Sequence, residues 1–383
     1  MAVDSVVITD SVNGICIEQF DQQFGPFQIV KTTLRGGPQD GVDIIDVIRD
    51  SFRTRIIPTR GMGLANVHLG ADSNNRFGWN SPVRGPIHPS LVPVTEPSGL
   101  GWLEGFDELL VRCGLKSNGA PTFDESGKLL YPLHGRIANL PASKVQLDYD
   151  PEKETLEISG TVVESRFHFD KLQLVTHYRF ESSGNCIQVS DKVTNLGGTP
   201  NDFQMLYHYN LGPQLLEPGG QIYIPATEIV PRDLGSAENV STWDQVHPPQ
   251  PGSAESAFFF QPKANSAGQS LALLTNTAKD LASGIRFASE TLPCFTLWKN
   301  FVAEQDGYVI GLEPGTNYPN TRPFESQHDR VVPLEPGQTK SIDFELVFAA
   351  SSEDVASLID ESTAVQANEP PEVSEHPRPD WCE

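Results

Sequence analysis

The clearest structural signal in the chain is Ser341-Ile342-Asp343-Phe344-Glu345-Leu346-Val347-Phe348. Apolar residues occupy every second position from Ile342 onward, and in an extended strand such positions lie on one face. The preceding Glu335-Pro336-Gly337-Gln338 has the composition of a turn. The pattern therefore predicts a half-buried β-strand that follows a tight turn.

Similar alternation recurs and predicts further strands at residues 156–163, 172–180 and 186–193. The stretch Ser182-Ser183-Gly184-Asn185 between the last two favours a hairpin. Helical periodicity is scarce, with one short helix predicted from Ser352 to Glu361 and a weaker one at residues 46–53. Because the 383 residues also include 31 Pro and 32 Gly, we expect an all-β protein, a large antiparallel β supersandwich with few short helices.

The sequence favours one large β domain over residues 1–350, followed by a short helix and an acidic, Pro-rich tail over residues 351–383. From residue 353 onward the only base is Arg378, whereas carboxylates recur throughout. Four prolines also lie beyond Ala367. Such a composition buries little apolar surface, so we expect this tail to be mostly disordered.

Composition narrows the function classes and the compartment. The formal net charge is −23, from 50 acids and 27 bases, so binding to nucleic acid or to an anionic membrane is not expected. The five cysteines are scattered and form no CxxC pair, which is typical of reduced thiols in a cytoplasmic protein. No signal peptide and no run long enough to span a membrane is visible. The oligomeric state does not follow from these features.

Two unusual stretches suggest chemistry. Glu313 lies in Gly311-Leu312-Glu313-Pro314-Gly315-Thr316-Asn317-Tyr318, between an apolar strand and a rigid turn. His208 lies about a hundred residues upstream, in Tyr207-His208-Tyr209-Asn210-Leu211-Gly212. A strand end fixes a side chain while the turn leaves it open to a ligand. We therefore interpret the two as a carboxylate and an imidazole acting on opposite sides of a sugar ring.

The segment from Gly78 to Pro141 is dense in Gly, Pro, Trp and His, a composition typical of loops that carry binding sites on a rigid scaffold. His88 lies in this segment and is a further candidate for lining the cavity that would hold the ligand of Glu313 and His208. Three tryptophans are candidates for stacking on a sugar, namely Trp79, Trp102 and Trp298. Lys299 is a candidate for holding an anionic group of a substrate, with a solvated lysine as the alternative.

These stretches together resemble the galactose-mutarotase-like superfamily, that is, aldose 1-epimerases and their relatives. The chain is most similar to an uncharacterised bacterial branch of unknown function, from Arg35-Gly36-Gly37 through Phe348. The stretches that carry the resemblance are Pro58-Thr59-Arg60-Gly61-Met62-Gly63, residues 101–115, residues 133–141 and residues 312–320. The resemblance implies the supersandwich fold and the interconversion of sugar anomers, with a monosaccharide or modified sugar as ligand.

The resemblance also implies roles for single residues. Glu313 matches the base of the mutarotases, and His208 matches their acid within a word that is one residue shorter here. His134, in Leu133-His134-Gly135, matches a histidine that contacts the sugar. Three arginines compete for the family's binding arginine, namely Arg84, Arg60 and Arg136, and no residue matches its sugar-binding Asp. Mutarotation consists of proton transfers alone, so neither a cofactor nor a metal is expected.

Alternatives remain open at this point. Glu313 could be a strand-end carboxylate bonded to turn amides, and the histidines and tryptophans could be structural. The chain could also be a non-catalytic carbohydrate-binding or sensing protein on the same fold. A glycosidase or lyase would need a second carboxylate, for which Asp107 or Glu104 are candidates. The chain contains no HxxxH, P-loop, GxGxxG or GxSxG motif.

Overall fold

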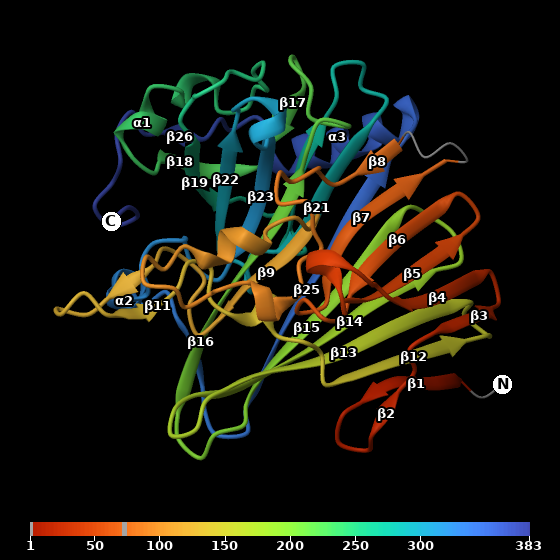
Figure 1. Cartoon of the computed structure of the whole chain (residues 1–383). Coiled ribbons are helices and arrows are strands. Elements are labelled where there is room, and N and C mark those ends of the chain that lie inside the picture. The colour runs from red at the N-terminus through yellow and green to blue at the C-terminus, as the bar shows by residue number, and fades with distance from the viewer. Residues whose placement is uncertain (1–2, 71–74) are drawn as a thin grey trace.

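Two large β-sheets packed face to face make up most of the molecule (Figure 1). The computed structural model describes residues 3–70 and 75–383. Within these ranges neighbouring strands run antiparallel, apart from the pair β18–β26 and an isolated bridge between Gly114 and Gly135. The fold is therefore the all-β, galactose-mutarotase-like supersandwich that the sequence predicts.

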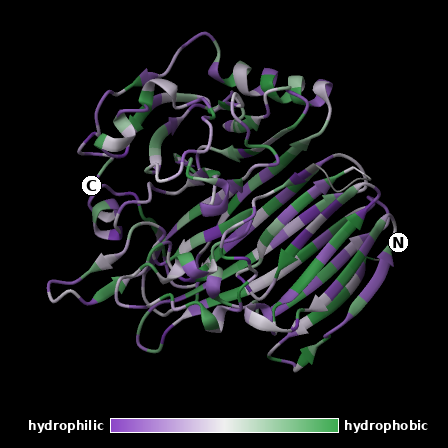
Figure 2. Cartoon of the chain, turned by 45° about the horizontal axis from the view of Figure 1, so that its top comes forward, coloured by the Kyte–Doolittle hydropathy of each residue, from purple (hydrophilic) through white to green (hydrophobic). Residues whose placement is uncertain are grey.

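The first sheet has ten described strands in the order β17-β20-β21-β25-β15-β14-β13-β12-β1-β2. Its central strands carry the alternating apolar pattern of the sequence, visible as stripes along the ribbons in Figure 2. The strands are β1 (Asp4–Asp10), β2 (Ile15–Cys16), β12 (Lys144–Asp150), β13 (Thr155–Ser165), β14 (Lys171–Glu181), β15 (Cys186–Asn195), β17 (Gln221–Tyr223), β20 (Gln269–Thr275), β21 (Ala282–Ala288) and β25 (Thr339–Ala349).

The second sheet has fourteen described strands, twelve of them in the order β26-β18-β19-β22-β23-β16-β9-β7-β6-β5-β4-β3, with β24 on β16 and β8 on β7. The strands are β3 (Phe20–Phe24), β4 (Phe27–Thr33), β5 (Asp43–Arg49), β6 (Phe52–Ile57), β7 (Gly63–Leu69), β8 (Asn75–Phe77), β9 (Leu110–Leu115), β16 (Asn201–Leu211), β18 (Ala226–Pro231), β19 (Ser256–Pro262), β22 (Cys294–Asn300), β23 (Val309–Gly315), β24 (Val332–Leu334) and β26 (Glu372–Val373).

Short elements complete the chain. A small hairpin pairs β10 (Thr122–Phe123) with β11 (Leu129–Tyr131). The α-helices are α1 (Leu234–Ala237), α2 (Arg322–Gln327) and α3 (Ser352–Gln366). The 3-10 turns are η1 (Gly37–Gln39), η2 (Pro89–Leu91), η3 (Gly101–Gly105), η4 (Ile137–Asn139), η5 (Val240–Thr242) and η6 (Glu304–Asp306). None of the helices in the described ranges is long and apolar enough to cross a membrane.

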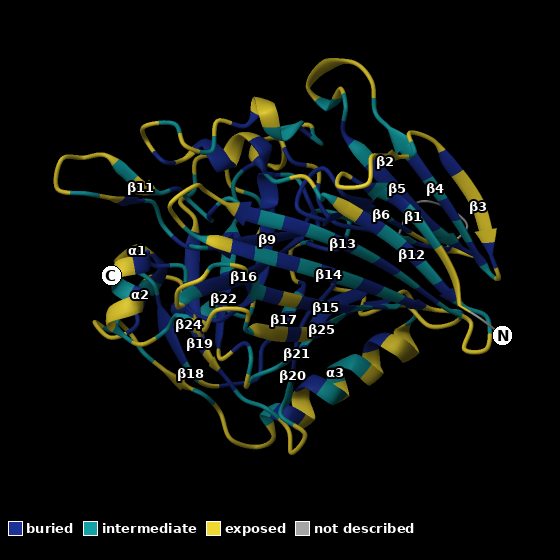
Figure 3. Cartoon of the chain, turned by 90° about the horizontal axis from the view of Figure 1, so that it is seen from below, coloured by how far each residue is buried: buried dark blue, intermediate teal, exposed yellow. Residues whose placement is uncertain are grey.

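Of the two helices predicted from the sequence, one is present in the structure and the other is not. The helix predicted at residues 352–361 is present and extends to Gln366, and its N-cap is Ser351, whose hydroxyl accepts from the Asp354 amide. It lies against β20 (Figure 3). The weaker helix predicted at residues 46–53 is wrong, because this stretch belongs to the β5–β6 hairpin. Asp46 there bonds across the hairpin to Arg53 and Arg55, cross-strand neighbours rather than helical ones.

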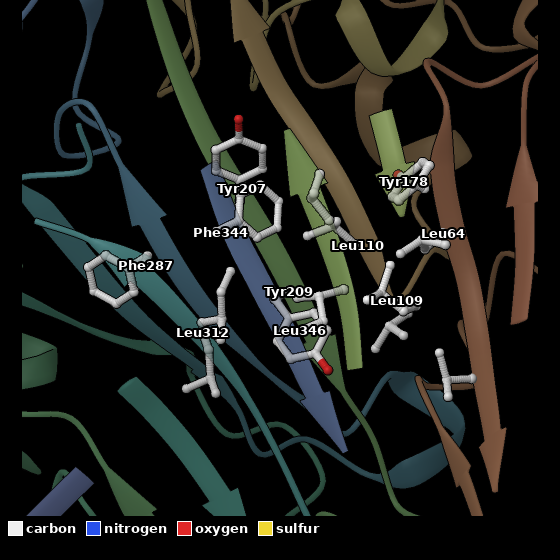
Figure 4. Packing of buried hydrophobic residues seen from close by; sticks show 14 of the residues in the cluster. Leu64, Leu109, Leu110, Tyr178, Tyr207, Tyr209, Phe287, Leu312, Phe344 and Leu346 are labelled. Atoms are coloured by element: carbon white, nitrogen blue, oxygen red, sulfur yellow. The ribbon is translucent and has the colours of Figure 1, made fainter. Parts of the chain in front are cut away.

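The core lies between the two sheets. Figure 4 shows Tyr207 and Tyr209 of β16 facing Phe344 and Leu346 of β25, with Leu312 of β23 beside them. The rings of Tyr207 and Phe344 have centroids 4.4 Å apart. Odd-numbered residues of β16 thus fill the core, and the even-numbered ones, including His208, lie on the opposite face of the sheet.

One buried ion pair joins the sheets. Arg112 of β9 reaches across the core to Asp191 of β15, with Nε–Oδ2 at 2.5 Å and Nη2–Oδ1 at 3.0 Å. The Tyr207 hydroxyl donates to the same carboxylate at 2.9 Å. Because the fork is bidentate and both side chains are fully enclosed, the pair fixes how the sheets align beneath His208.

The expectation of a mostly disordered tail is wrong. β26 adds a parallel strand beside β18, and Trp381 stacks on Tyr318 with centroids 4.9 Å apart. Asn320 donates to the Trp381 carbonyl at 2.8 Å, and Arg378 forms an ion pair with Glu228. A single aromatic anchor and a few polar contacts thus dock a segment whose average composition is that of a disordered chain.

Candidate active site

Glu313 and His208 meet on adjacent strands of the second sheet. β23 and β16 pair directly, with Leu312 opposite Tyr209 and Gly311 opposite Asn210. His208 Nε2 lies 3.2 Å from Glu313 Oε1, within ion-pair distance, although the atoms are not aligned as a hydrogen bond. Both side chains are almost fully buried. The two stretches singled out in the sequence therefore come together at one point.

A cavity of about 460 Å³ opens above this pair. Aromatic side chains from the segment 78–141 and from β22 form much of its wall, namely Trp79, Trp102, Phe106 and Trp298. Glu313, His208 and His134 also line it, together with Thr296 of β22. A largely apolar pocket with a few converging polar groups is the usual form of a small-molecule site.

Gly311 makes room for the pair. It precedes Glu313 by two residues on β23, so both lie on the same face of the strand. A Cβ at Gly311 would lie 2.3 Å from Glu313 Oε1 and 3.1 Å from His208 Cε1. Any side chain there would displace the carboxylate. The word Gly-x-Glu in a strand is a sequence signal for this space, and the sequence predictions did not use it.

Asn210 sets the tautomer of His208. The Asn210 side-chain nitrogen donates to the carbonyls of Glu108 and His208, at 2.9 and 3.2 Å. Its oxygen therefore faces His208 Nδ1, 2.6 Å away, and must accept a hydrogen bond from it. With the proton of the neutral ring on Nδ1, Nε2 presents a lone pair toward Glu313.

Burial favours the uncharged form of both members of the pair. Desolvation, with a smaller contribution from Glu255, raises the pKa of Glu313 well above its usual value. Desolvation, with a smaller contribution from His134, lowers the pKa of His208 well below its usual value. Desolvation therefore favours a carboxylic acid beside a neutral imidazole. The expectation that one group starts ionised and the other protonated stays a prediction.

The expected placement of Glu313 and His208 on opposite sides of a sugar ring is wrong for this structure. Two atoms 3.2 Å apart leave no space for a pyranose between them. A ligand can instead lie above both, with two neighbouring oxygens reaching the two groups.

His134 borders the same cavity. Its Nδ1 donates to the Asn118 carbonyl at 2.9 Å, so Nε2 of the neutral ring is an acceptor. Burial lowers the pKa of His134 to about 4. The ring contacts Trp102 edge-on with centroids 4.5 Å apart. Asn118 in turn exchanges two 2.8 Å hydrogen bonds with Asn317, which follows Glu313 in the chain.

Several buried polar atoms of residues that line this cavity have no hydrogen-bond partner within the part of the chain that the structure describes. These are Nε1 of Trp79, Nε1 of Trp102, Oγ1 of Thr296 and Oε1 of Glu313. Buried donors and acceptors are rarely left unpaired, because each unpaired group costs about 1–3 kcal/mol. Two donors, a hydroxyl and a carboxyl oxygen therefore belong to residues around a space in which a hydroxyl-rich ligand could satisfy them.

Arg232 and Glu255 are cavity residues that the sequence predictions missed. Arg232 Nη2 lies 3.0 Å from Glu255 Oε1, and Trp298 Nε1 donates to Glu255 Oε2 at 2.8 Å. Arg232 is therefore the arginine of this cavity, in a segment where no motif marks it. Its pairing could not be read from the sequence, because Glu255 and Trp298 lie on different parts of the chain.

Arg60 and Lys299 were predicted to bind substrate but are bonded to the protein instead. Arg60 forms a buried pair with Glu108 at 2.6 Å and donates to the Gly105 carbonyl. Lys299 Nζ donates to three main-chain carbonyls, those of Thr242, Trp243 and Gln245. Burial lowers the pKa of Lys299 to about 8. Neither residue lines the cavity, so their geometry supports a structural role.

The other predicted residues also lie elsewhere. Arg84 is exposed and borders a different cavity, together with Asp107. His88 bonds to Ser90 in its own loop. Arg136 lines a separate cavity described below. Glu104 is exposed and does not line the Glu313 cavity. A substrate-binding role in the Glu313 cavity is therefore not supported for these residues.

Among the described residues, no three His, Cys, Asp or Glu side chains are grouped so that they could hold a metal ion.

A family defined as a domain of unknown function, DUF4432, matches residues 39–348. The chain belongs to this family. Its sequence is also 32% identical to that of a candidate aldose 1-epimerase from Klebsiella pneumoniae. The crystal structure of that protein matches this one with a TM-score of 0.93, over 98% of this chain and 99% of that one. The DUF4432 chain is thereby a member of the aldose-1-epimerase-like branch that the sequence stretches indicate.

More distant structures share the fold. A galactose mutarotase-like protein from Clostridium acetobutylicum is 14% identical, with a TM-score of 0.56 over 85% of this chain and 99% of that one. A galactose 1-epimerase from Lactobacillus acidophilus is 12% identical, with a TM-score of 0.55 over 85% and 99%. At these identities the likeness concerns the fold alone. No curated protein is significantly similar to the chain in sequence.

Proposed function

We propose that this DUF4432 protein interconverts the anomers of a monosaccharide or a modified sugar. The contact between Glu313 and His208 on the floor of an aromatic cavity carries the proposal. In a cyclic sugar the ring oxygen and the anomeric hydroxyl are both bonded to C1. An acid and a base side by side can therefore reach both oxygens at once, which is what ring opening requires.

The uncharged forms that burial favours indicate the first step. Glu313, as a carboxylic acid, donates its proton to the ring oxygen while His208 Nε2 takes the proton of the anomeric hydroxyl. The C1–ring oxygen bond breaks and a carbonyl forms at C1, leaving a carboxylate and an imidazolium. After rotation about C1–C2, the ring hydroxyl attacks the other face of the carbonyl. It returns its proton to Glu313 while His208 protonates the new anomeric oxygen.

The resemblance implies Glu313 as base and His208 as acid, and the proposed cycle uses them in those roles during ring closure. During opening the roles are exchanged, because burial favours the uncharged pair. Every step is a proton transfer between residues of the chain and the sugar. The proposed reaction therefore needs no cofactor.

Neighbouring residues would hold the sugar. His134 Nε2 would accept a hydrogen bond from a hydroxyl, since its Nδ1 is committed to Asn118. Trp298, which is only partly buried, would pack on a face of the ring. We also propose a cytoplasmic location, which fits the five free thiols.

Exchange NMR across a panel of aldoses and sugar acids tests the proposal. We expect the wild type to accelerate exchange between the α and β signals of at least one sugar, at enzyme concentrations far below that of the sugar. Saturable binding without faster exchange would favour a non-catalytic carbohydrate-binding protein. Release of nitrophenol from aryl glycosides would instead indicate a glycosidase and overturn the proposal.

A further inference from the structure

A second cavity, of about 540 Å³, lies on the other side of the loop that carries His134. Leu133 and His134 border the sugar cavity, whereas Pro132, Gly135 and Arg136 border the second one. Its remaining walls come from Thr95, from Lys116 and Ser117 after β9, from the β10–β11 hairpin and from the β13–β14 turn. It is therefore a separate space with one loop in common with the first.

The second cavity is cationic in a strongly acidic protein. Its lining includes Lys116, Lys128, Arg136 and Arg166, against Glu164 and Asp170, whereas the whole chain has a net charge of −23. Lys116 is neutralised by Asp170 and Asp202, at 3.2 and 2.8 Å. The other three cations give the cavity its excess positive charge.

Arg136 is the partly buried cation of this cavity whose side chain has no protein partner among the described residues. Among the described residues its guanidinium forms no hydrogen bond or ion pair, although the residue is partly buried. Its main chain is fixed, because its amide donates to the Gly114 carbonyl at 2.9 Å. The Arg136 charge acts on the carboxyl group of Glu164, which already accepts the Leu115 amide at 2.8 Å. An unpaired guanidinium fork on a fixed main chain suits a phosphate or carboxylate.

Ser117 supplies an independent sign of a ligand. It is 2% exposed and lines the cavity, and its hydroxyl has no hydrogen-bond partner. Leaving a buried hydroxyl unpaired is costly, and an oxygen of a bound ligand would pair with it. The wall also has apolar parts, including Leu129, Tyr131 and Phe169. The volume exceeds that of an inorganic anion, so the cavity has space for an organic body.

We propose that this cavity binds the phosphate monoester of a small organic molecule. The dianion would lie on Arg136 and on the Ser117 hydroxyl, with Lys128 and Arg166 at the rim. The organic body would pack against the apolar wall at Leu129. The proposal does not depend on the sugar chemistry of the first cavity.

Calorimetric titration with phenyl phosphate at constant ionic strength tests this site, with phenol as the uncharged counterpart. We expect saturable binding of phenyl phosphate with a Kd below about 1 mM and no measurable binding of phenol. Arg136→Gln should weaken phenyl phosphate binding by about tenfold or more, since it removes charge-assisted hydrogen bonds to the dianion. Lys128→Gln, an exposed change that cannot disturb folding, should weaken it less.

Two matched variants locate the site. Arg84→Gln removes an exposed charge at a different cavity and should leave the affinity unchanged. Arg232→Gln removes the arginine of the sugar cavity and should also leave it unchanged. An equal loss in Arg84→Gln would mean non-specific attraction and overturn the proposal. Loss in Arg232→Gln but not in Arg136→Gln would place the phosphate in the sugar cavity and overturn it too.

Discussion

Strands β13 and β16 have the same length and opposite burial. Both are eleven residues long, but β13 alternates between buried and partly exposed residues, whereas β16 is buried without a break from Phe203 to Leu211. Figure 3 shows the alternation along β13 and β14. The outer face of β13 meets solvent, and the outer face of β16 is covered by the loops of the segment 78–141.

This contrast between β13 and β16 indicates on which strand face functional residues are to be expected. On β13 the outer positions need only be polar, and side chains such as Glu157 meet solvent there. On β16 the outer positions are enclosed, so His208 and Asn210 are polar groups that must be bonded or used. A polar residue on the covered face of a strand is therefore a better sign of function than the same residue on an open face.

The largest expected effect is that of Glu313→Gln on anomer exchange. Gln keeps the size of the side chain but cannot give or take the proton, so exchange should fall by about two to four orders of magnitude. Sugar affinity, measured by calorimetry, should change little. Glu157→Gln makes the same change on the open face of β13 and should leave exchange as in the wild type. Equal losses in the two variants would break the comparison.

Asp191→Ala should be the most destabilising of these changes. It leaves Arg112 buried without its partner, which costs about 3–5 kcal/mol, and the loss should appear in urea unfolding. Glu157→Ala removes an open-face carboxylate paired with His177 at 2.8 Å and should cost less than about 1 kcal/mol. Similar costs for the two would show that the enclosed Arg112–Asp191 pair and the open-face Glu157–His177 pair do not differ in this way.

Gly311→Ala should lower exchange by about 10²-fold, the scale expected when a reacting group is displaced by about 1 Å. The added methyl would overlap the Glu313 carboxyl. Gly198→Ala adds the same methyl in open space and is the control. Full activity in Gly311→Ala would mean that the carboxyl position seen here is not the working one.

Deletion of the tail after Ala367 should lower the thermal midpoint by several degrees, because it removes the Trp381–Tyr318 stack and β26. We propose that residues 1–350 unfold as one unit on which this tail is docked. Differential scanning calorimetry should show a single shifted transition. An unchanged midpoint would restore the expectation of a disordered tail, and two separate transitions would contradict the single unit.

The smallest expected effect is on the pH dependence of stability. Burial lowers the pKa of His134 to about 4 from the usual 6.5, so between these values the unfolded chain binds more protons than the folded one. The contribution is therefore complete above about pH 6.5 and is lost as the pH falls toward 4. His134→Gln should flatten the fall of the thermal midpoint over this range relative to the wild type, whereas His88→Gln, in an outer loop, should not.

Local pattern was enough to predict four strands of the first sheet, namely β13, β14, β15 and β25. Residues 341–348 and 186–193 alternate because one face of each is open, and both are strands in the structure. The same rule was uninformative for β16, where burial on both faces removes the alternation. Short words also marked Glu313, His208 and His134, since a strand end and a Gly-rich turn are local features.

The remaining site residues depend on contacts between distant segments. Arg232 enters the cavity through its bond to Glu255, and Arg60 leaves the candidate set because it is paired with Glu108. The two arginines do not differ in local sequence in a way that reports these partners. The tail misled for a related reason, because average composition does not reveal one aromatic anchor such as Trp381.

Trp79, Trp102 and Trp298 all line the Glu313 cavity, and they are three of the five tryptophans in the chain. Indole emission depends on the polarity around the ring, so a ligand in this cavity would change the surroundings of all three rings. The protein therefore contains its own optical reporter. Replacing Trp243 and Trp381 with Phe would confine that emission to the cavity, so that occupancy could be followed in stopped-flow mixing without any attached dye.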